Sequence, residues 1–286
     1  MTPNLSLEGR DVVVAGLLVS GRRVLLGHRD PGRDYYPDCW DVPGGHVEAG
    51  EEPAAALRRE LDEELGVDVE EPRRLPDATL LGPEVDFRLW VVRRWRGEAA
   101  NRAPEEHDEV GWRTLAEAVT LRLAHPGLRR ILASALGVEY WVGAVVHDPA
   151  GRVLLRPPGT AGPPVPVRPA GLDATPGRDP GGPVPCWQVA SGEADAGTLR
   201  HGLQRDTGVA AHVPGEAPVA LVEDGGQALA VWDVPWPEPE PAVVGTAPGA
   251  GLVWHEPEAA RACLAAVPAL LAVVGGVVGW GAAGRH

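Results

Sequence analysis

The chain has 286 residues, of which 44% are hydrophobic and 23% are charged, so it can form one large or two ordinary globular domains. The formal net charge of −14 argues against a general surface for nucleic-acid polymers, although a divalent metal can still hold the phosphates of a small substrate. Three scattered cysteines without a CxxC pair, and a start without signal-peptide features, predict a protein of the reducing cytoplasm.

The first half of the chain alternates between strand and helix patterns. A helix is predicted from Pro53, which suits a first helical turn, to Gly66, which suits a C-terminal stop. Strands are predicted at 12–19, 24–26, 79–81 and 87–95, and a last helix at 126–135. This order predicts a sheet covered by helices.

The segment GHVEAGEEPAAALRRELDEELGV, at 45–67, carries the strongest chemical pattern. On a helix, Glu60, Glu63 and Glu64 stand at positions i, i+3 and i+4, so they project from one face. Like charges at this spacing destabilise a helix by about 0.2–0.5 kcal/mol per pair. Mg2+ and Mn2+ reverse this penalty, because they prefer oxygen ligands and bind carboxylates together with substrate phosphates. The pattern therefore predicts a metal site that acts on a pyrophosphate.

This segment resembles the signature of the Nudix hydrolase family, Gly-x5-Glu-x7-Arg-Glu-U-x-Glu-Glu-x-Gly-U, where U is aliphatic. All nine specified positions are filled, by Gly45, Glu51, Arg59, Glu60, Leu61, Glu63, Glu64, Gly66 and Val67. In element order the resemblance extends over about residues 10–136. It implies an α/β (α+β) fold, an α/β/α sandwich with a mixed sheet. It also implies Mg2+-dependent cleavage of a diphosphate bond in a nucleoside diphosphate derivative.

The resemblance also implies roles for individual residues. The side chains that match the family's metal ligands are Glu60, Glu63 and Glu64. The carbonyl of Gly44 is expected as a further ligand, and Arg59 with Glu51 matches the family's structural ion pair. These residues make up the expected catalytic centre, with Mg2+ as its cofactor and Mn2+ as an alternative.

Residues outside the signature complete the expected site. The family's catalytic base is either a signature glutamate or a carboxylate on a later loop, and here that loop spans 104–109. Glu106 is the candidate, followed by Glu105, with a solvated acidic turn as the alternative. Residues expected to face the substrate are Arg29, Arg33 and Tyr35, with Tyr36 beside them; ordinary surface side chains are the alternative.

The second half of the chain repeats the first. LRHGLQRDTGV at 199–209 corresponds to LRRELDEELGV at 57–67, an offset of 199 − 57 = 142. The same offset relates Trp232 to Trp90 and Trp254 to Trp112. The sequence therefore predicts the fold twice in tandem, as a catalytic domain at 1–137 and a degenerate copy at 138–286. A Pro/Gly-rich loop is expected at about 156–185 in the second copy.

The second copy has lost the metal-ligand pattern. Its residues at the positions of Arg59, Glu60, Glu63 and Glu64 are His201, Gly202, Arg205 and Asp206. Cys186 and Trp187 correspond to Cys39 and Trp40 at an offset of 147, which predicts that the loop before the helix is five residues shorter. We therefore expect a Nudix-like fold that binds no metal in the family manner and serves as a packing partner. Completion of the first domain's substrate pocket, or binding of a regulatory nucleotide, is the alternative.

The uncharged tail LAAVPALLAVVGGVVGWGAAG, at 264–284, raises the question of a membrane span. Because Pro268 corresponds to Pro126, we expect a hydrophobic helix buried between the two domains and no membrane partner. The expected partner is a small nucleotide. An oxidised nucleoside triphosphate, as in enzymes of the 8-oxo-dGTP diphosphatase type, is the first candidate. ADP-ribose or a nucleotide sugar, or a nucleotide-sensing role without turnover, are the alternatives, and the sequence does not indicate the oligomeric state.

Overall fold

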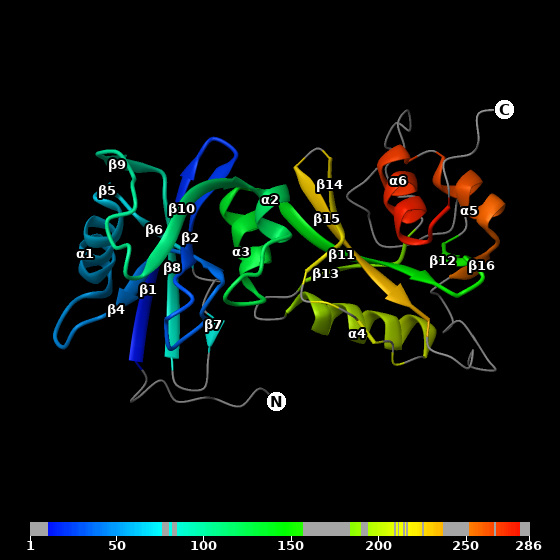
Figure 1. Cartoon of the computed structure of the whole chain (residues 1–286), viewed down its shortest axis with the longest axis horizontal. Helices are drawn as coiled ribbons and strands as arrows, with labels where there is room; N and C mark the ends of the chain where they lie inside the picture. The colour runs from blue at the N-terminus through cyan, green and yellow to red at the C-terminus, as the bar shows by residue number, and fades with distance from the viewer. Residues whose placement is uncertain are drawn as a thin grey trace, which may run out of the picture. The chain divides into compact units, whose positions relative to one another are not determined.

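The chain divides into two compact units, Met1–Leu136 and Gly137–His286, in the computed structural model (Figure 1). The structure describes residues 11–75, 80–81, 85–156, 184–189, 194–208, 210, 212–213, 215, 217–224, 226–236, 252–265 and 267–280. Most of the predicted Pro/Gly-rich loop at about 156–185 lies outside the described residues.

The first unit is built on a mixed sheet whose central strand is β1 (Asp11–Ser20). β1 pairs antiparallel with β2 (Arg23–Arg29) and β4 (Gly44–His46), and parallel with β8 (Val85–Val92). Because β1 is covered on both faces, it is apolar and buried from Val14 to Val19. The other strands are β3 (Trp40–Asp41), β5 (Asp68–Glu70), β6 (Arg73–Arg74), β7 (Leu80–Leu81), β9 (Arg94–Arg96) and β10 (His107–Thr114).

Helices cover both faces of this sheet. Figure 1 shows α1 (Pro53–Leu65) on one side, and α2 (Leu115–Val119) and α3 (Leu128–Ala135) on the other. The predicted helix from Pro53 to Gly66 is confirmed, since Gly66 ends it with a φ of 70° in the left-handed region. The apolar stripe of α1, fully buried against the sheet, consists of Leu57, Leu61 and Leu65. The acidic residues of α1 therefore lie along a different face of the helix.

The predicted strand at 87–95 is two strands. After Val92 the chain leaves the main sheet, and β9 pairs antiparallel with β5 in a separate two-stranded sheet. The apolar pattern runs through both strands because Trp90 and Trp95 pack on the same core that α1 covers. Periodicity alone did not reveal the break.

The second unit is built on a sheet whose central strand is β11 (Glu139–His147). β11 pairs antiparallel with β12 (Val153–Leu155) and β13 (Cys186–Gln188), and parallel with β15 (Gln227–Pro235). Figure 1 shows α4 (Asp195–Thr207) on one side of this sheet, and α5 (Pro257–Leu264) and α6 (Pro268–Val277) on the other. The remaining strands among the described residues are β14 (Ala220–Asp224) and β16 (Val253–His255).

The register of the second sheet corrects one correspondence between the two halves of the sequence. Opposite β11, Cys186 faces Gly143 and Trp187 faces Val142, where the first sheet pairs Gly44 with Ala15 and Gly45 with Val14. In both units the residue before this pair is a proline, Pro43 or Pro185, whose carbonyl accepts a hydrogen bond from the central strand at 2.9 or 3.0 Å. Cys186 and Trp187 therefore take the places of Gly44 and Gly45, not those of Cys39 and Trp40.

This correction removes the predicted shortening of the loop before the second helix. Pro185 follows Pro43 at an offset of 142, and α4 begins 142 residues after α1. The expected five-residue deletion is therefore wrong. It came from matching two Cys-Trp pairs in different places, because Cys39 precedes β3 whereas Cys186 begins β13.

The apolar tail forms α6, the helix that the sequence predicts. Leu270 and Val274 are fully buried in the core of the second unit, together with Leu264 of α5. Among the described residues, no helix has both the length and the apolar character that a membrane crossing needs.

Candidate functional site

Glu64 is the most deeply buried carboxylate of α1, with 3% of the residue exposed. One of its oxygens accepts a hydrogen bond from the backbone N–H of Gly44 at 2.9 Å. Burial, together with the smaller effect of the nearby carboxylates of Glu106 and Glu60, raises the pKa of Glu64 to about 9. A carboxyl group with such a pKa lacks a compensating positive charge.

Two glycines bring the backbone of β4 against these carboxylates. A Cβ on Gly45 would lie 2.5 Å from the carboxyl carbon of Glu60, closer than side-chain atoms normally approach. Gly44 has a φ of 148°, and a Cβ there would lie 2.1 Å from the carbonyl oxygen of Val14. The carboxylate of Glu60 therefore favours glycine at position 45, whereas the backbone conformation of position 44 and its closeness to β1 favour glycine there.

Arg59 joins the loop before α1 to the helix. Its Nε and Nη2 donate to the two oxygens of Glu51 at 3.2 and 3.0 Å, and Nη2 also donates to the carbonyl of His46 at 3.1 Å. The hydrogen bonds from Arg59 hold the pKa of Glu51 below its usual value. This is the ion pair that the resemblance implies. Nη1 of Arg59 further contacts Glu60 at 2.9 Å and Glu63 at 3.3 Å.

Glu106 lies close to the acidic face of α1. Its charge raises the pKa of both Glu64 and Glu60, which places the three carboxylates in one neighbourhood. Its carboxylate pairs with Nη2 of Arg33 at 3.2 Å, and 35% of its side chain is exposed. Glu105 is exposed. Of the two candidates on the later loop, Glu106 is therefore the one that lies beside the acidic face of α1.

Asp41 is an acidic residue of this site that the sequence interpretation missed. Burial raises its pKa to about 6, although the backbone N–H of Val42 and the charge of Arg29 act in the opposite direction. Its charge also contributes to the raised pKa of Glu64. A signal was present in the sequence, because Asp41 lies two residues before the Pro-Gly-Gly turn that leads into the signature.

The expected substrate-facing residues have different environments. Arg29 donates to the carbonyl of Tyr35 from Nε at 3.1 Å and from Nη2 at 2.9 Å, and its Nη1 lies 3.6 Å from Asp41. Arg29 therefore stabilises the loop between β2 and β3. Tyr35 itself is 77% exposed, so its ring is accessible to a ligand. Arg33 is engaged by Glu106.

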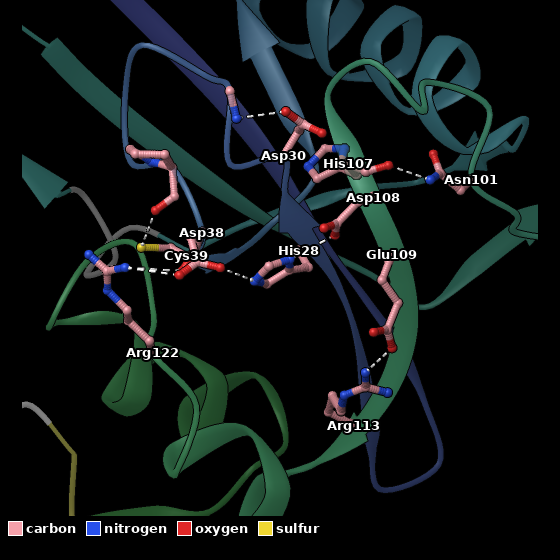
Figure 2. Close-up of polar contacts among 12 residues, drawn as sticks. His28, Asp30, Asp38, Cys39, Asn101, His107, Asp108, Glu109, Arg113 and Arg122 are labelled. Carbon is pink, nitrogen blue, oxygen red and sulfur yellow. Dashed lines mark hydrogen bonds and ion pairs between the residues drawn. The ribbon is translucent and has the colours of Figure 1, made fainter.

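A histidine that the sequence interpretation did not single out ties this loop to β10. Figure 2 shows the His28 side chain between Asp38 and Asp108, with its Nδ1 2.7 Å from Asp108 and its Nε2 3.5 Å from Asp38. Arg122 contacts the carboxylate of Asp38 at 3.5 Å from the other side. The His28 ring also lies 5.2 Å from the ring of Trp40. These contacts fix the end of the loop at Asp38.

His107 anchors the segment that carries Glu106. Only 3% of His107 is exposed, and its ring fills the space beside Gly27, where a Cβ would lie 2.4 Å from the ring. Burial lowers its pKa to about 4, so the ring is neutral near pH 7. Asn101 donates to its backbone carbonyl at 2.6 Å (Figure 2).

The donor chemistry of the site fits a hard divalent cation. Among the described residues, no three acidic, histidine or cysteine side chains are gathered into a ready-made metal site. In this structure Arg59 holds Glu60 and Glu63, and Arg33 holds Glu106. The oxygen-only donors and the uncompensated charge around Glu64 are nevertheless what Mg2+ or Mn2+ would satisfy.

The corresponding place in the second unit is filled by an indole. A Cβ on Gly202 would lie 2.3 Å from the ring of Trp187, so the ring packs directly on the helix backbone. The indole N–H of Trp187 donates to Asp206 at 3.0 Å, and Arg205 contacts the other oxygen of Asp206 at 2.8 Å. Gly202 and Asp206 stand at the positions of Glu60 and Glu64.

Comparisons with known proteins agree with this geometry. The model of the NUDIX domain matches residues 9–135. A candidate 8-oxo-dGTP diphosphatase of Mycobacterium tuberculosis is 38% identical over 109 residues, which are 37% of this chain and 74% of that protein. An 8-oxo-dGTP diphosphatase of Haemophilus influenzae is 33% identical over 89 residues, 29% of this chain and 62% of that protein.

A solved structure, the MutT NUDIX hydrolase from Burkholderia pseudomallei, is 28% identical, with a TM-score of 0.39, and covers 45% of this chain and 97% of that chain. The matched residues include the whole glutamate motif, its Arg59–Glu51 ion pair and the glycines that admit Glu60. The chain belongs to the Nudix family, and it is an enzyme of the pyrophosphohydrolase class.

Proposed function

We propose that the first unit hydrolyses an oxidised nucleoside triphosphate to a nucleoside monophosphate and pyrophosphate, with Mg2+ as cofactor and Mn2+ as an alternative. The observation that carries this proposal is the group of carboxylates around Glu64, whose pKa is raised to about 9 by its burial and by the charges of Glu106 and Glu60. The proposed metal ligands are Glu60, Glu63, Glu64 and the carbonyl of Gly44. The bound metal would supply a Lewis acid at the pyrophosphate and a water of lowered pKa.

The protein's own residues have separate tasks in this proposal. Arg59 and Glu51 hold the loop against α1 and keep Glu60 and Glu63 in position. Glu106 is our candidate for the general base, because its partly exposed carboxylate lies beside the proposed ligands and within reach of solvent. Tyr35 offers an exposed ring on which a base can stack.

The choice of substrate rests on the relatives. Proteins from Mycobacterium tuberculosis, Proteus vulgaris and Haemophilus influenzae whose names carry 8-oxo-dGTP diphosphatase activity are 38%, 27% and 33% identical over the matched residues. ADP-ribose and nucleotide sugars remain alternatives, because the residues that distinguish them lie outside the glutamate motif. A small nucleotide as partner and a cytoplasmic location are part of the proposal, in keeping with three cysteines that form no disulfide.

Product analysis tests the function directly. Purified full-length protein with Mg2+ would be incubated with 8-oxo-dGTP, dGTP, ADP-ribose and a nucleotide sugar, and the products separated by chromatography. We expect turnover of 8-oxo-dGTP to the monophosphate and pyrophosphate, and none by the Glu63→Gln variant. Preferred turnover of ADP-ribose would replace the substrate proposal. Binding of a nucleotide without turnover, with Mn2+ also present, would favour a sensor.

We further propose that the second unit is a degenerate copy of the first that binds no catalytic metal. The shared strand pairing and the common offset of 142 support the repeat. Trp187, packed on Gly202 and bonded to Asp206, supports the loss of the metal site. A variant with Glu60, Glu63 and Glu64 changed to glutamine should bind no Mn2+ in calorimetry. Retained binding at the affinity of the unaltered protein would place a metal site elsewhere, including the second unit.

A further inference from the structure

The turn that carries Arg33 is fastened to the backbone of its ion-pair partner. The N–H of Asp30 donates to the carbonyl of Glu106 at 2.9 Å, and the carbonyl of Asp30 accepts from the N–H of Arg33 at 3.1 Å. The carboxylate of Asp30 accepts from the N–H of Gly32 at 2.7 Å, which closes the turn. Figure 2 shows Asp30 beside His107, the residue that follows Glu106. The main chain therefore brings Arg33 to Glu106.

The three arginines of the site differ in how firmly they are engaged. Arg59 is bound by both oxygens of Glu51 and by the carbonyl of His46, and Arg29 by the carbonyl of Tyr35 through two nitrogens. The side chain of Arg33 has one ion pair within the described residues, from its Nη2 to the carboxylate of Glu106 at 3.2 Å. Arg33 is also the most exposed of the three, at 37% of its side chain, against 27% for Arg59 and 17% for Arg29. It is therefore the arginine that can change partner at the lowest cost.

Glu106 is the carboxylate for which a cation and Arg33 would compete. It stands close enough to Glu60 and Glu64 for its charge to act on both. A divalent cation held by these residues would attract Glu106 and repel the guanidinium of Arg33. An anionic substrate at the same place would attract that guanidinium, because arginine matches the geometry of phosphate oxygens.

We propose that Arg33 and Glu106 exchange partners when the enzyme is loaded, so that Glu106 turns to the metal and Arg33 turns to a phosphate of the nucleotide. The inference rests on the proposed metal-dependent function. It assigns Arg33 a second state in addition to the ion pair seen here. A bound metal frees Arg33 for the nucleotide, and a bound nucleotide frees Glu106 for the metal. Each ligand therefore strengthens the binding of the other by the same factor.

Calorimetry of the full-length protein tests the exchange without relying on turnover. Mn2+ would be titrated with and without an α,β-methylene nucleoside triphosphate, which resists hydrolysis at the proposed bond. Arg33→Gln removes the competing charge, so it should bind Mn2+ alone about two- to fivefold more tightly than the unaltered protein. The nucleotide should increase the Mn2+ affinity of the unaltered protein, and in the same variant this increase should be about fivefold smaller. Arg33→Lys, which keeps the charge, should retain part of this enhancement.

A matched variant and two contrary outcomes make the test decisive. Arg94→Gln on β9 breaks two ion pairs, with Glu70 of β5 and with the following Glu71, and should change neither quantity. If Arg33→Gln binds Mn2+ more weakly in the absence of nucleotide, or leaves the coupling unchanged, Arg33 only positions Glu106 and the exchange is wrong. If the unaltered protein binds no Mn2+ even with nucleotide, the proposed metal-dependent function fails as well.

Discussion

The two units differ at one corresponding contact between a strand and a helix. The glycine is on the strand in the first unit and on the helix in the second. In the first unit a glycine on the strand, Gly45, admits a carboxylate from the helix, Glu60. In the second unit a tryptophan on the strand, Trp187, packs on a glycine of the helix, Gly202. The strand register and the helix bounds agree, so the difference lies in the side chains. A metal site on this fold needs space on the strand as well as carboxylates on the helix.

The indole of Trp187 also provides a hydrogen bond for Asp206, the acidic residue at the position that corresponds to Glu64. Asp206 accepts from the indole N–H of Trp187 and from Arg205, whereas Glu64 accepts from a backbone N–H and faces further carboxylates. An acidic side chain with two such donors does not need a cation. In our proposal the second unit keeps the fold without the metal, because a buried indole contributes apolar area that a hydrated site would not.

We expect the largest difference in turnover between a substitution of Glu64 and the matching substitution of its counterpart Asp206. Glu64→Gln keeps an oxygen that can accept from Gly44 but removes the charge that the metal requires. Turnover should therefore fall by a factor of about 100 or more, since Lewis acid catalysis contributes several kcal/mol. Asp206→Asn should leave turnover unchanged. Steady-state rates of the two variants with the preferred nucleotide provide the measurement.

Circular dichroism of both variants is the control for this pair. Glu64→Gln should be as folded as the unaltered protein, because its hydrogen bond from Gly44 is kept. Comparable losses of turnover in Glu64→Gln and Asp206→Asn would show that both units take part in catalysis, and would remove the asymmetry proposed here.

A smaller effect is expected from Gly45→Ala in the first unit. The added Cβ would lie 2.5 Å from the carboxyl carbon of Glu60, and that carboxylate can give way because it ends a flexible side chain. The fold should therefore persist while Glu60 moves from its place. We expect roughly a tenfold loss in Mn2+ affinity, within the range that misplaced ligand geometry costs. Unchanged Mn2+ affinity in calorimetry would show that Glu60 is not a ligand.

Gly202→Ala in the second unit should affect stability and leave turnover unchanged. Its Cβ would lie 2.3 Å from the ring of Trp187, which is rigid and is held by Asp206. Overpacking of this kind costs about 1–3 kcal/mol. Thermal denaturation followed by tryptophan fluorescence should show a lower midpoint, with the initial rate of hydrolysis unaltered below the transition. A loss of activity without a loss of stability would mean that the second unit contributes to the active site.

The sequence predicted the parts of the site that lie within one element. The helix from Pro53 to Gly66, its acidic face and its buried leucine stripe all follow from helical periodicity. The pairing of Arg59 with Glu51 came from the resemblance. These predictions succeed because residues close in the chain fix their geometry.

Contacts between distant segments were not predictable in the same way. Arg33 pairs with Glu106 because the turn at Asp30 is hydrogen-bonded to the backbone just before β10. Nothing in the sequence of either segment predicts this contact. The match of Cys186-Trp187 to Cys39-Trp40 failed for a related reason. Identical residue pairs suggested it, but the hydrogen-bond register of β13 with β11 decides which strand each pair belongs to.

The smallest expected effect concerns a histidine that only the first unit has. His125 precedes Pro126, and the residue before the corresponding Pro268 is the buried Val267. Burial lowers the pKa of His125, and its Nδ1 accepts a hydrogen bond from the N–H of Gly127 at 3.0 Å, which requires that nitrogen to be unprotonated. The ring of His125 therefore takes up a proton more readily in the unfolded chain than in the folded unit.

The sign of the pH dependence follows from this difference. As the pH falls below about 6.5, the ordinary pKa of histidine, the unfolded chain takes up a proton that the folded unit resists. The first unit should therefore lose stability with falling pH until the folded-state pKa is reached. His125→Asn keeps an acceptor for Gly127 but does not titrate, so it should flatten this decline. Thermal midpoints of both proteins between pH 7 and pH 5 provide the measurement, and equal slopes would show that His125 is as easily protonated in the folded unit as in the unfolded chain.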